Sequence, residues 1–170
     1  EIKEPGLNVL PPGVERHVVN AGGLTGLQIY PEDEIEIINE EGNQICEIIC
    51  FDKDGKSELG ILNQKENCKK SFIKELLKGK DESSLITNLQ LKKRNLDINK
   101  SKSSILFDEQ TPSGEKIKIK SKDKCYVIFA APQNNMLVSE QNPSSDLTLF
   151  IKRNKIVNDK ELSIIPDPIY

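Results

Sequence analysis

The sequence predicts an α+β, mainly β fold, in which twisted antiparallel sheets form a barrel or sandwich and a helical insertion occupies about residues 64–95. Three observations predict it. From Val14 onward, short segments rich in β-branched residues alternate with turns carrying Gly, Pro, Asn or Asp. The same pattern returns after residue 103. Between these β-rich parts, apolar residues recur at helical spacing among many lysines and glutamates.

Length and charge limit the possible roles of the chain. Its 170 residues carry a net charge of −3, and a chain of this size fits one domain with its own core. Lysines alternate with acidic residues, so no nucleic-acid partner is expected. The sequence has no signal-peptide pattern and no apolar run long enough for a membrane span. We therefore expect a cytoplasmic, bacterial protein without a membrane partner.

The first β-rich part is predicted to be a β-meander that follows an extended lead-in over residues 1–13. Its strands are Val14–Val19, Leu24–Tyr30, Glu34–Ile38 and Gln44–Phe51. The third strand alternates apolar and charged residues, which predicts one buried face. The fourth is almost continuously apolar, which predicts burial on both faces.

The middle of the chain is predicted to be helical. Asn63 and Glu66 have the spacing of a capping box, and Gly79 is a suitable end for the helix that follows. A second, weaker pattern covers Ser84–Asn95. The apolar stripes of the two helices would be Cys68, Phe72, Ile73, Leu76 and Leu77 in the first and Leu85, Ile86 and Leu89 in the second.

The second β-rich part completes a single domain predicted over residues 14–153. Its strands are Ser104–Phe107, Glu115–Lys120, Cys125–Ala130 and Leu147–Ile151. Residues 154–170 include Pro166-Asp167-Pro168 and are predicted to be a linker toward a following domain. The first residue is Glu1 and not Met, so we expect a chain that is either processed or cut from a longer protein.

Few residues suggest catalysis. His17 is the only histidine, and at mid-strand it is interpreted as half-buried and not as a general base. Cys46 and Cys50 would lie on one face of a strand but too far apart for a disulfide. With Cys68 and Cys125 they are expected to be reduced thiols packed as small hydrophobes, so no metal site is expected and the catalytic residues stay unknown.

Two polar loops next to predicted core strands are the candidates for ligand binding. Loops on a rigid β scaffold often carry binding groups, but Asn and Gln also cap strands and turns. Both interpretations stay open. The candidate ligand-binding residues are Asn43, Gln44, Glu47, Gln141, Asn142 and Asp146.

Three segments also resemble a known family. Glu15–Gly22, Asn39–Glu47 with its Glu-Gly-Asn-Gln turn, and Ala130–Pro132 followed by Ser139–Leu147 resemble the urea-carboxylase-associated protein family. The likeness covers both ends of the chain and not the lysine-rich middle. It is to the form of the domain found at the N-terminus of glycine-cleavage T-like, folate-dependent aminomethyltransferases.

This resemblance implies one of two roles. The first is a non-catalytic accessory or ligand-presenting N-terminal domain, with tetrahydrofolate bound in another domain of the same longer chain and homo-oligomers possible. The alternative is a metal-dependent deiminase-type hydrolase acting on carboxyguanidine in urea and guanidine metabolism. Family members of the second kind carry a late segment with His and Cys, where this chain has Gln133–Met136. We therefore expect the first role. A plain ligand-binding β-barrel, with the two polar loops facing each other, is a third reading.

Overall fold

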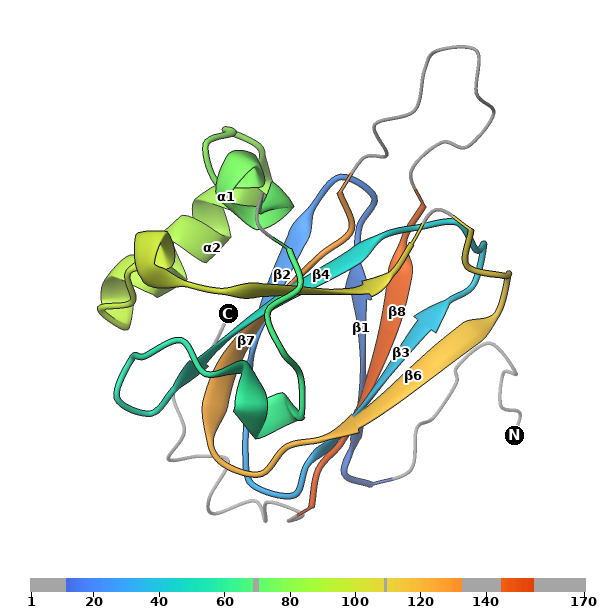
Figure 1. The fold of residues 1–170 in the computed structure, drawn as a ribbon, viewed down its shortest axis with the longest axis horizontal. Coiled ribbons are helices and arrows are strands. Elements are labelled where there is room, and N and C mark those ends of the chain that lie inside the picture. Colours follow the sequence, from blue (N-terminus) through green and yellow to red (C-terminus); the bar gives the residue numbers. More distant parts are fainter. Residues whose placement is uncertain (1–11, 69–70, 109, 133–144, 155–170) are drawn as a thin grey trace, which may run out of the picture.

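The chain folds as a sandwich of two four-stranded antiparallel sheets (Figure 1). The computed structural model describes residues 12–68, 71–108, 110–132 and 145–154. The predicted mainly β, α+β class is confirmed. Of the two predicted architectures, barrel and sandwich, the structure has the sandwich. The linker predicted over 154–170 and the lead-in over 1–13 lie almost wholly outside the described residues and stay predictions.

Eight strands make the two sheets. Sheet A has the order β1-β8-β3-β6 and sheet B the order β2-β7-β4-β5. The strands are β1 (Val14–Val19), β2 (Leu24–Ile29), β3 (Glu34–Asn39), β4 (Cys46–Asp52), β5 (Ser103–Phe107), β6 (Glu115–Lys120), β7 (Cys125–Ala130) and β8 (Leu147–Lys152). The helices are α1 (Phe72–Leu76) and α2 (Glu82–Lys93), with short 3₁₀ turns η1 (Leu59–Leu62) and η2 (Ile98–Lys100).

The predicted β-meander is wrong, although its four strands exist. β1 and β3 belong to sheet A, whereas β2 and β4 belong to sheet B. Each of these strands pairs with a strand from the second half of the chain, as β1 does with β8 and β2 with β7. Alternation of apolar residues reports which face of a strand is buried. It carries no information about which strand lies alongside, so the strand pairing could not be predicted from the sequence.

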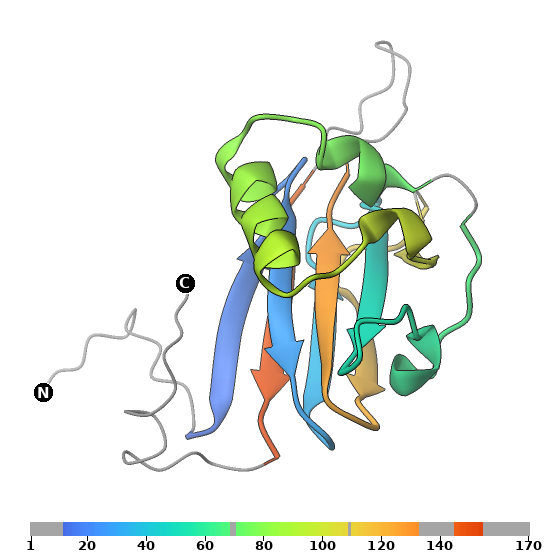
Figure 2. The same cartoon turned by 90° about the vertical axis from the view of Figure 1, so that its left-hand side faces the viewer.

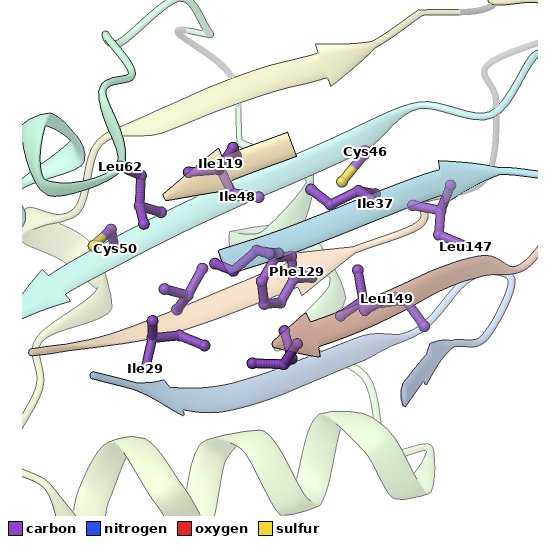
Figure 3. Packing of buried hydrophobic residues seen from close by; sticks show 14 of the residues in the cluster. Ile29, Ile37, Cys46, Ile48, Cys50, Leu62, Ile119, Phe129, Leu147 and Leu149 are labelled. Atoms are coloured by element: carbon purple, nitrogen blue, oxygen red, sulfur yellow. The ribbon is translucent and has the colours of Figure 1, made fainter. Parts of the chain in front are cut away.

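The main core lies between the sheets. Figure 3 shows Ile37 and Leu149 of sheet A and Ile48 and Phe129 of sheet B with their side chains in the layer between the strands. All four are fully buried. Each lies on the face of its strand that meets the core, and successive residues of a strand point to opposite faces.

The helical insertion lies over the outer face of sheet B (Figure 2), and a second apolar layer fills the space between them. Ile49 of β4 and Ile128 of β7 pack there against Ile73, Leu77 and Leu91 of the helical insertion. β4 and β7 are therefore covered on both faces, as the near-continuous apolar sequence of β4 predicted.

The first helix is much shorter than predicted. Asn63 does not cap its start, because it adopts a left-handed conformation (φ 60°) at the end of η1. Helix α1 begins after Ser71, whose Oγ accepts a hydrogen bond from the N–H of Lys74 at 3.2 Å. Gly79 follows the helix, with its N–H donating to the carbonyl of Leu76 at 3.0 Å. Both helices nevertheless fall within the predicted insertion.

Helix α2 presents the opposite face from the one predicted. Ser84, Thr87 and Leu91 are its buried residues. The predicted apolar stripe points to solvent instead, with exposures of 51% for Leu85, 50% for Ile86 and 64% for Leu89. Small inward side chains let the helix lie close to sheet B, and Ser84 Oγ donates to the carbonyl of Leu76 at 2.7 Å.

The C-terminal end of α2 is anchored to sheet B through Arg94. Its guanidinium lies 4.4 Å from the ring centre of Tyr126 and donates to Gln28 Oε1 at 2.7 Å. The Tyr126 ring crosses β2 at Gly26, where an added Cβ would lie only 2.0 Å from the Tyr126 hydroxyl oxygen. Gly26 is therefore required for this close approach. None of the helices in the described part of the chain has the length and apolar character of a membrane span.

Candidate functional site

Three connections between strands meet at one end of the sandwich, and Gln44 lies among them. We call this region the loop end; it comprises residues 20–23, 39–45, 131–132 and 145–146. Gln44 is fully buried. Its Nε2 donates to the carbonyls of Pro132 at 2.7 Å and Ile45 at 2.9 Å, and its Oε1 accepts from the N–H of Ser145 at 2.8 Å. One neutral amide thus holds both ends of the connection between β7 and β8.

Asp146 joins the same end from an exposed position. Its Oδ1 accepts a hydrogen bond from the N–H of Ala21 at 2.7 Å. In the same turn, the N–H of Gly22 donates to the carbonyl of Ala131 at 2.6 Å. The N–H of Gly23 donates to the carbonyl of Asn20 at 2.8 Å, so these three donors of the glycine-bearing turn are already used within the fold.

Asn43 shapes the neighbouring turn. It has φ 59° and follows Gly42 with φ 78°, conformations that Asn and Gly adopt more easily than other residues. The Asn43 N–H donates to the carbonyl of Thr111 at 2.7 Å. A Cβ on Gly42 would lie 2.7 Å from the nitrogen of Ser113. The Glu-Gly-Asn-Gln turn is thus shaped by close packing against the loop before β6.

Two buried polar atoms beside Gln44 have no hydrogen-bond partner in the described part of the chain. They are Asn39 Oδ1 and Ser145 Oγ. Asn39 Nδ2 donates to the carbonyl of Gln44 at 2.8 Å, so its amide is held in place. Buried polar atoms of this kind are usually satisfied by ordered water. Asn39 was missed in the sequence, although alternation along Glu34–Asn39 places it on the inward face.

Glu47 lies apart from the loop end, under helix α1. Its carboxylate is fully buried on the helix-covered face of sheet B. It accepts hydrogen bonds from Ser71 Oγ at 2.6 Å, from the N–H of Phe72 at 2.7 Å and from the N–H of Ile73 at 3.0 Å. The structure therefore brings Asn43, Gln44 and Asp146 together and separates Glu47 from them. Gln141 and Asn142 lie outside the described residues.

A second polar cluster forms at the opposite end of β1. Arg153 Nη1 donates to Asp33 Oδ2 at 2.7 Å, while its Nε and Nη2 donate to the two oxygens of Glu15 at 3.0 Å each. His17 Nε2 lies 3.0 Å from Glu15 Oε1. The hydrogen bond with His17, followed by the interactions with Arg153, lowers the pKa of Glu15 from 4.5 to about 2. Glu15 is therefore held as a carboxylate.

This cluster fastens the first strand to the last. The N–H of Arg153 donates to the carbonyl of Gly13 at 2.7 Å, and the N–H of Asn154 donates to Asp33 Oδ1 at 2.8 Å. Asp33 is only 1% exposed. No local pattern could reveal the cluster, because its partners are more than a hundred residues apart in sequence.

The cysteines pack as predicted in three of four cases. Cys46, Cys50 and Cys125 are buried in the main core, whereas Cys68 is partly exposed. Burial raises the pKa of the Cys46 thiol, and a hydrogen bond with Cys125 and burial raise that of Cys50. The Cys46 and Cys50 thiols therefore stay protonated, whereas the hydrogen bond with Cys50 lowers the pKa of Cys125. In the described residues, no group of three or more His, Cys, Asp or Glu side chains could hold a metal ion.

Comparison with known proteins gives a relative across nearly the whole chain. A trimethylamine-oxide aldolase from Ruegeria pomeroyi is 32% identical to it over 168 residues. The chain is homologous to a part of this aldolase. The matched region is 99% of this chain and 21% of the aldolase, so the chain spans about a fifth of its relative's length. It includes the helical insertion, which the resemblance read from the sequence did not cover.

The chain was also compared with protein-family models and with solved structures. No protein-family model matches the chain. A crystal structure of a DUF1989 family protein from Silicibacter pomeroyi DSS-3 superposes with a TM-score of 0.47 and 12% sequence identity, over 92% of this chain and 83% of that one.

Proposed function

We propose that this domain is a non-catalytic accessory module of a larger protein related to trimethylamine-oxide aldolase, and that it presents the loop end to neighbouring domains. The observation that carries the proposal is the alignment of 99% of this chain with only 21% of the aldolase. A region of that size is one domain of a protein several times longer.

The hydrogen bonds of three buried or half-buried polar side chains favour a structural role for them over a catalytic one. Glu47 holds the start of α1, Gln44 holds both ends of the β7–β8 connection, and Arg153 is used by Glu15 and Asp33. General acid–base catalysis needs a group free to exchange a proton with a substrate. These groups are instead engaged with the fold.

The ligand-presenting part of the proposal rests on the loop end. Asn39 Oδ1 and Ser145 Oγ are buried and without partners among the described residues. They suit a small molecule or a backbone segment that donates neutral hydrogen bonds. The folate-dependent aminomethyltransferase chemistry implied by the sequence resemblance, and its tetrahydrofolate, would then belong to regions of such a protein outside this chain.

A domain exchange tests the proposal. The matched fifth of the Ruegeria pomeroyi aldolase is replaced by this chain, and turnover of trimethylamine oxide is measured. We expect turnover to be retained. Within the exchanged protein, His17→Gln and Asp146→Asn should each leave kcat within about threefold, whereas removing a group with general acid–base function costs about 10²- to 10⁴-fold.

The matched control is Glu47→Ala, which should lower the thermal stability of the exchanged protein while leaving the kcat of its folded fraction unchanged. A loss of kcat of a hundredfold or more in the His17 or Asp146 variant, with normal folding, would contradict a non-catalytic role. Ammonia released from carboxyguanidine by the isolated chain would do so as well, in favour of the hydrolase alternative.

A further inference from the structure

Helix α2 carries an apolar stripe that nothing in the described structure covers. Glu82, Ile86, Leu89 and Lys93 follow one another at spacings of four, three and four residues, with Leu85 beside them. Residues at these spacings share one face of a helix. Of the four exposed large apolar residues in the described chain, three lie on this stripe; the fourth is Tyr30.

The fold itself has no use for this face. Helix α2 already packs on sheet B through Leu91, with Ser84 and Thr87 also buried, and Arg94 fixes its C-terminal end on Tyr126. Figure 2 shows α2 on the outside of sheet B, with its far side turned away from the strands. Clustered aliphatic side chains at half exposure or more are typical of an interaction surface.

The charges at the two ends of the stripe indicate what covers it. Glu82 lies at the N-terminal end and Lys93 at the C-terminal end. We propose that a second copy of this chain covers it, with the two α2 helices antiparallel about a two-fold axis. Glu82 of each copy then meets Lys93 of the other, and Ile86 meets Leu89. Such a surface is complementary to itself, as two-fold interfaces must be.

A membrane surface fits the stripe less well than a second copy does. A membrane surface favours helices with basic residues along the polar flanks, whereas this stripe has an acidic residue at one end and a basic one at the other. The stripe is also short, because twelve residues span about 18 Å. The pair buries less than the roughly 1,200 Å² of a stable interface, so the association is weak and reversible.

Sedimentation velocity of the 170-residue chain, from micromolar to millimolar concentration, tests the proposal. We expect a monomer that becomes a dimer as concentration rises. Leu89→Gln should abolish the dimer. Glu82→Lys and Lys93→Glu should each lower the association constant by about tenfold, because each turns two opposite-charge contacts into like-charge contacts. The double variant Glu82→Lys/Lys93→Glu should restore it.

The matched control is the exposed pair Glu75 and Lys78 of the neighbouring segment, joined at 3.3 Å. Glu75→Lys should leave the association constant unchanged. Thermal unfolding of each variant verifies that the domain stays folded, since Glu82 lies in the first turn of α2. A monomer at every concentration overturns the proposal. So does a dimer that the single variants do not weaken, or that the double variant does not restore.

Discussion

At the scale of single residues, Glu47 was predicted as a candidate for ligand binding, and in the structure its carboxylate holds the start of α1. A fully buried Glu is rare without a partner. The structure gives it partners that are not cations. They are the hydroxyl of Ser71 and the first two N–H groups of α1, which a helix start leaves free for an acceptor.

Replacing this carboxylate should reduce stability strongly. Glu47→Ala leaves three buried donors without an acceptor and should lower the free energy of unfolding by about 2–4 kcal/mol. Glu47→Gln keeps one acceptor oxygen and should cost less. Urea unfolding measures both. The exposed Glu41→Ala is the control and should stay within about 0.5 kcal/mol of wild type. Equal effects at positions 41 and 47 would contradict the anchoring role.

At the scale of elements, the sequence predicted where the strands lie along the chain but not which strands pair. Val14–Val19 and Cys125–Ala130 form strands with the predicted bounds, because β-branched runs between turn residues have a local signature. The partner of each strand depends on how the chain crosses between sheets. Helix α2 was placed correctly but turned the wrong way, because its buried face uses Ser84 and Thr87, which pattern reading counts as polar.

Two leucines on α2 distinguish the observed face from the predicted one. Leu91→Ala should lower the free energy of unfolding by about 2–4 kcal/mol, because it opens a cavity against sheet B. Leu89→Ala should change it by less than about 0.5 kcal/mol at concentrations where the chain is monomeric. Urea unfolding of both variants is the measurement. A larger effect of Leu89→Ala than of Leu91→Ala would show that the face predicted from the sequence is the buried one.

At the scale of the whole molecule, the two sheets differ in their outer faces. Sheet B is covered by the helical insertion, whereas sheet A turns Glu34, Lys116, Lys118, Lys120 and Lys152 outward as exposed residues. The sequence could predict the charged face of β3 and β6 from their alternation. It could not predict that Arg153 joins Glu15 to Asp33, nor that Gln44 meets Ser145, because such contacts depend on the finished fold.

The Arg153 cluster should make the molecule sensitive to acid in a defined range. The folded-state pKa of Glu15 is about 2, against 4.5 ordinarily. A lowered carboxyl pKa contributes stability above the ordinary value and loses it as pH falls toward the folded value. Stability should therefore fall as pH drops from 4.5 toward 2, and Glu15→Gln should flatten this part of the curve.

Denaturant unfolding at a series of pH values measures this dependence. Arg16→Gln, at the adjacent exposed position, is the control, because arginine does not titrate in this range. If the stability of Glu15→Gln falls as steeply between pH 4.5 and 2 as that of wild type, the Arg153 cluster does not cause the acid sensitivity.

The alternation of β1 to β4 between the sheets has a consequence for synthesis of the protein. When synthesis has reached the end of β4, the chain contains β1 to β4 and none of the strands with which these pair. β1 must wait for β8, more than a hundred residues later, and chains dominated by such distant contacts fold slowly. At roughly 5–20 residues per second, the nascent β1 strand therefore stays without its partner for several seconds.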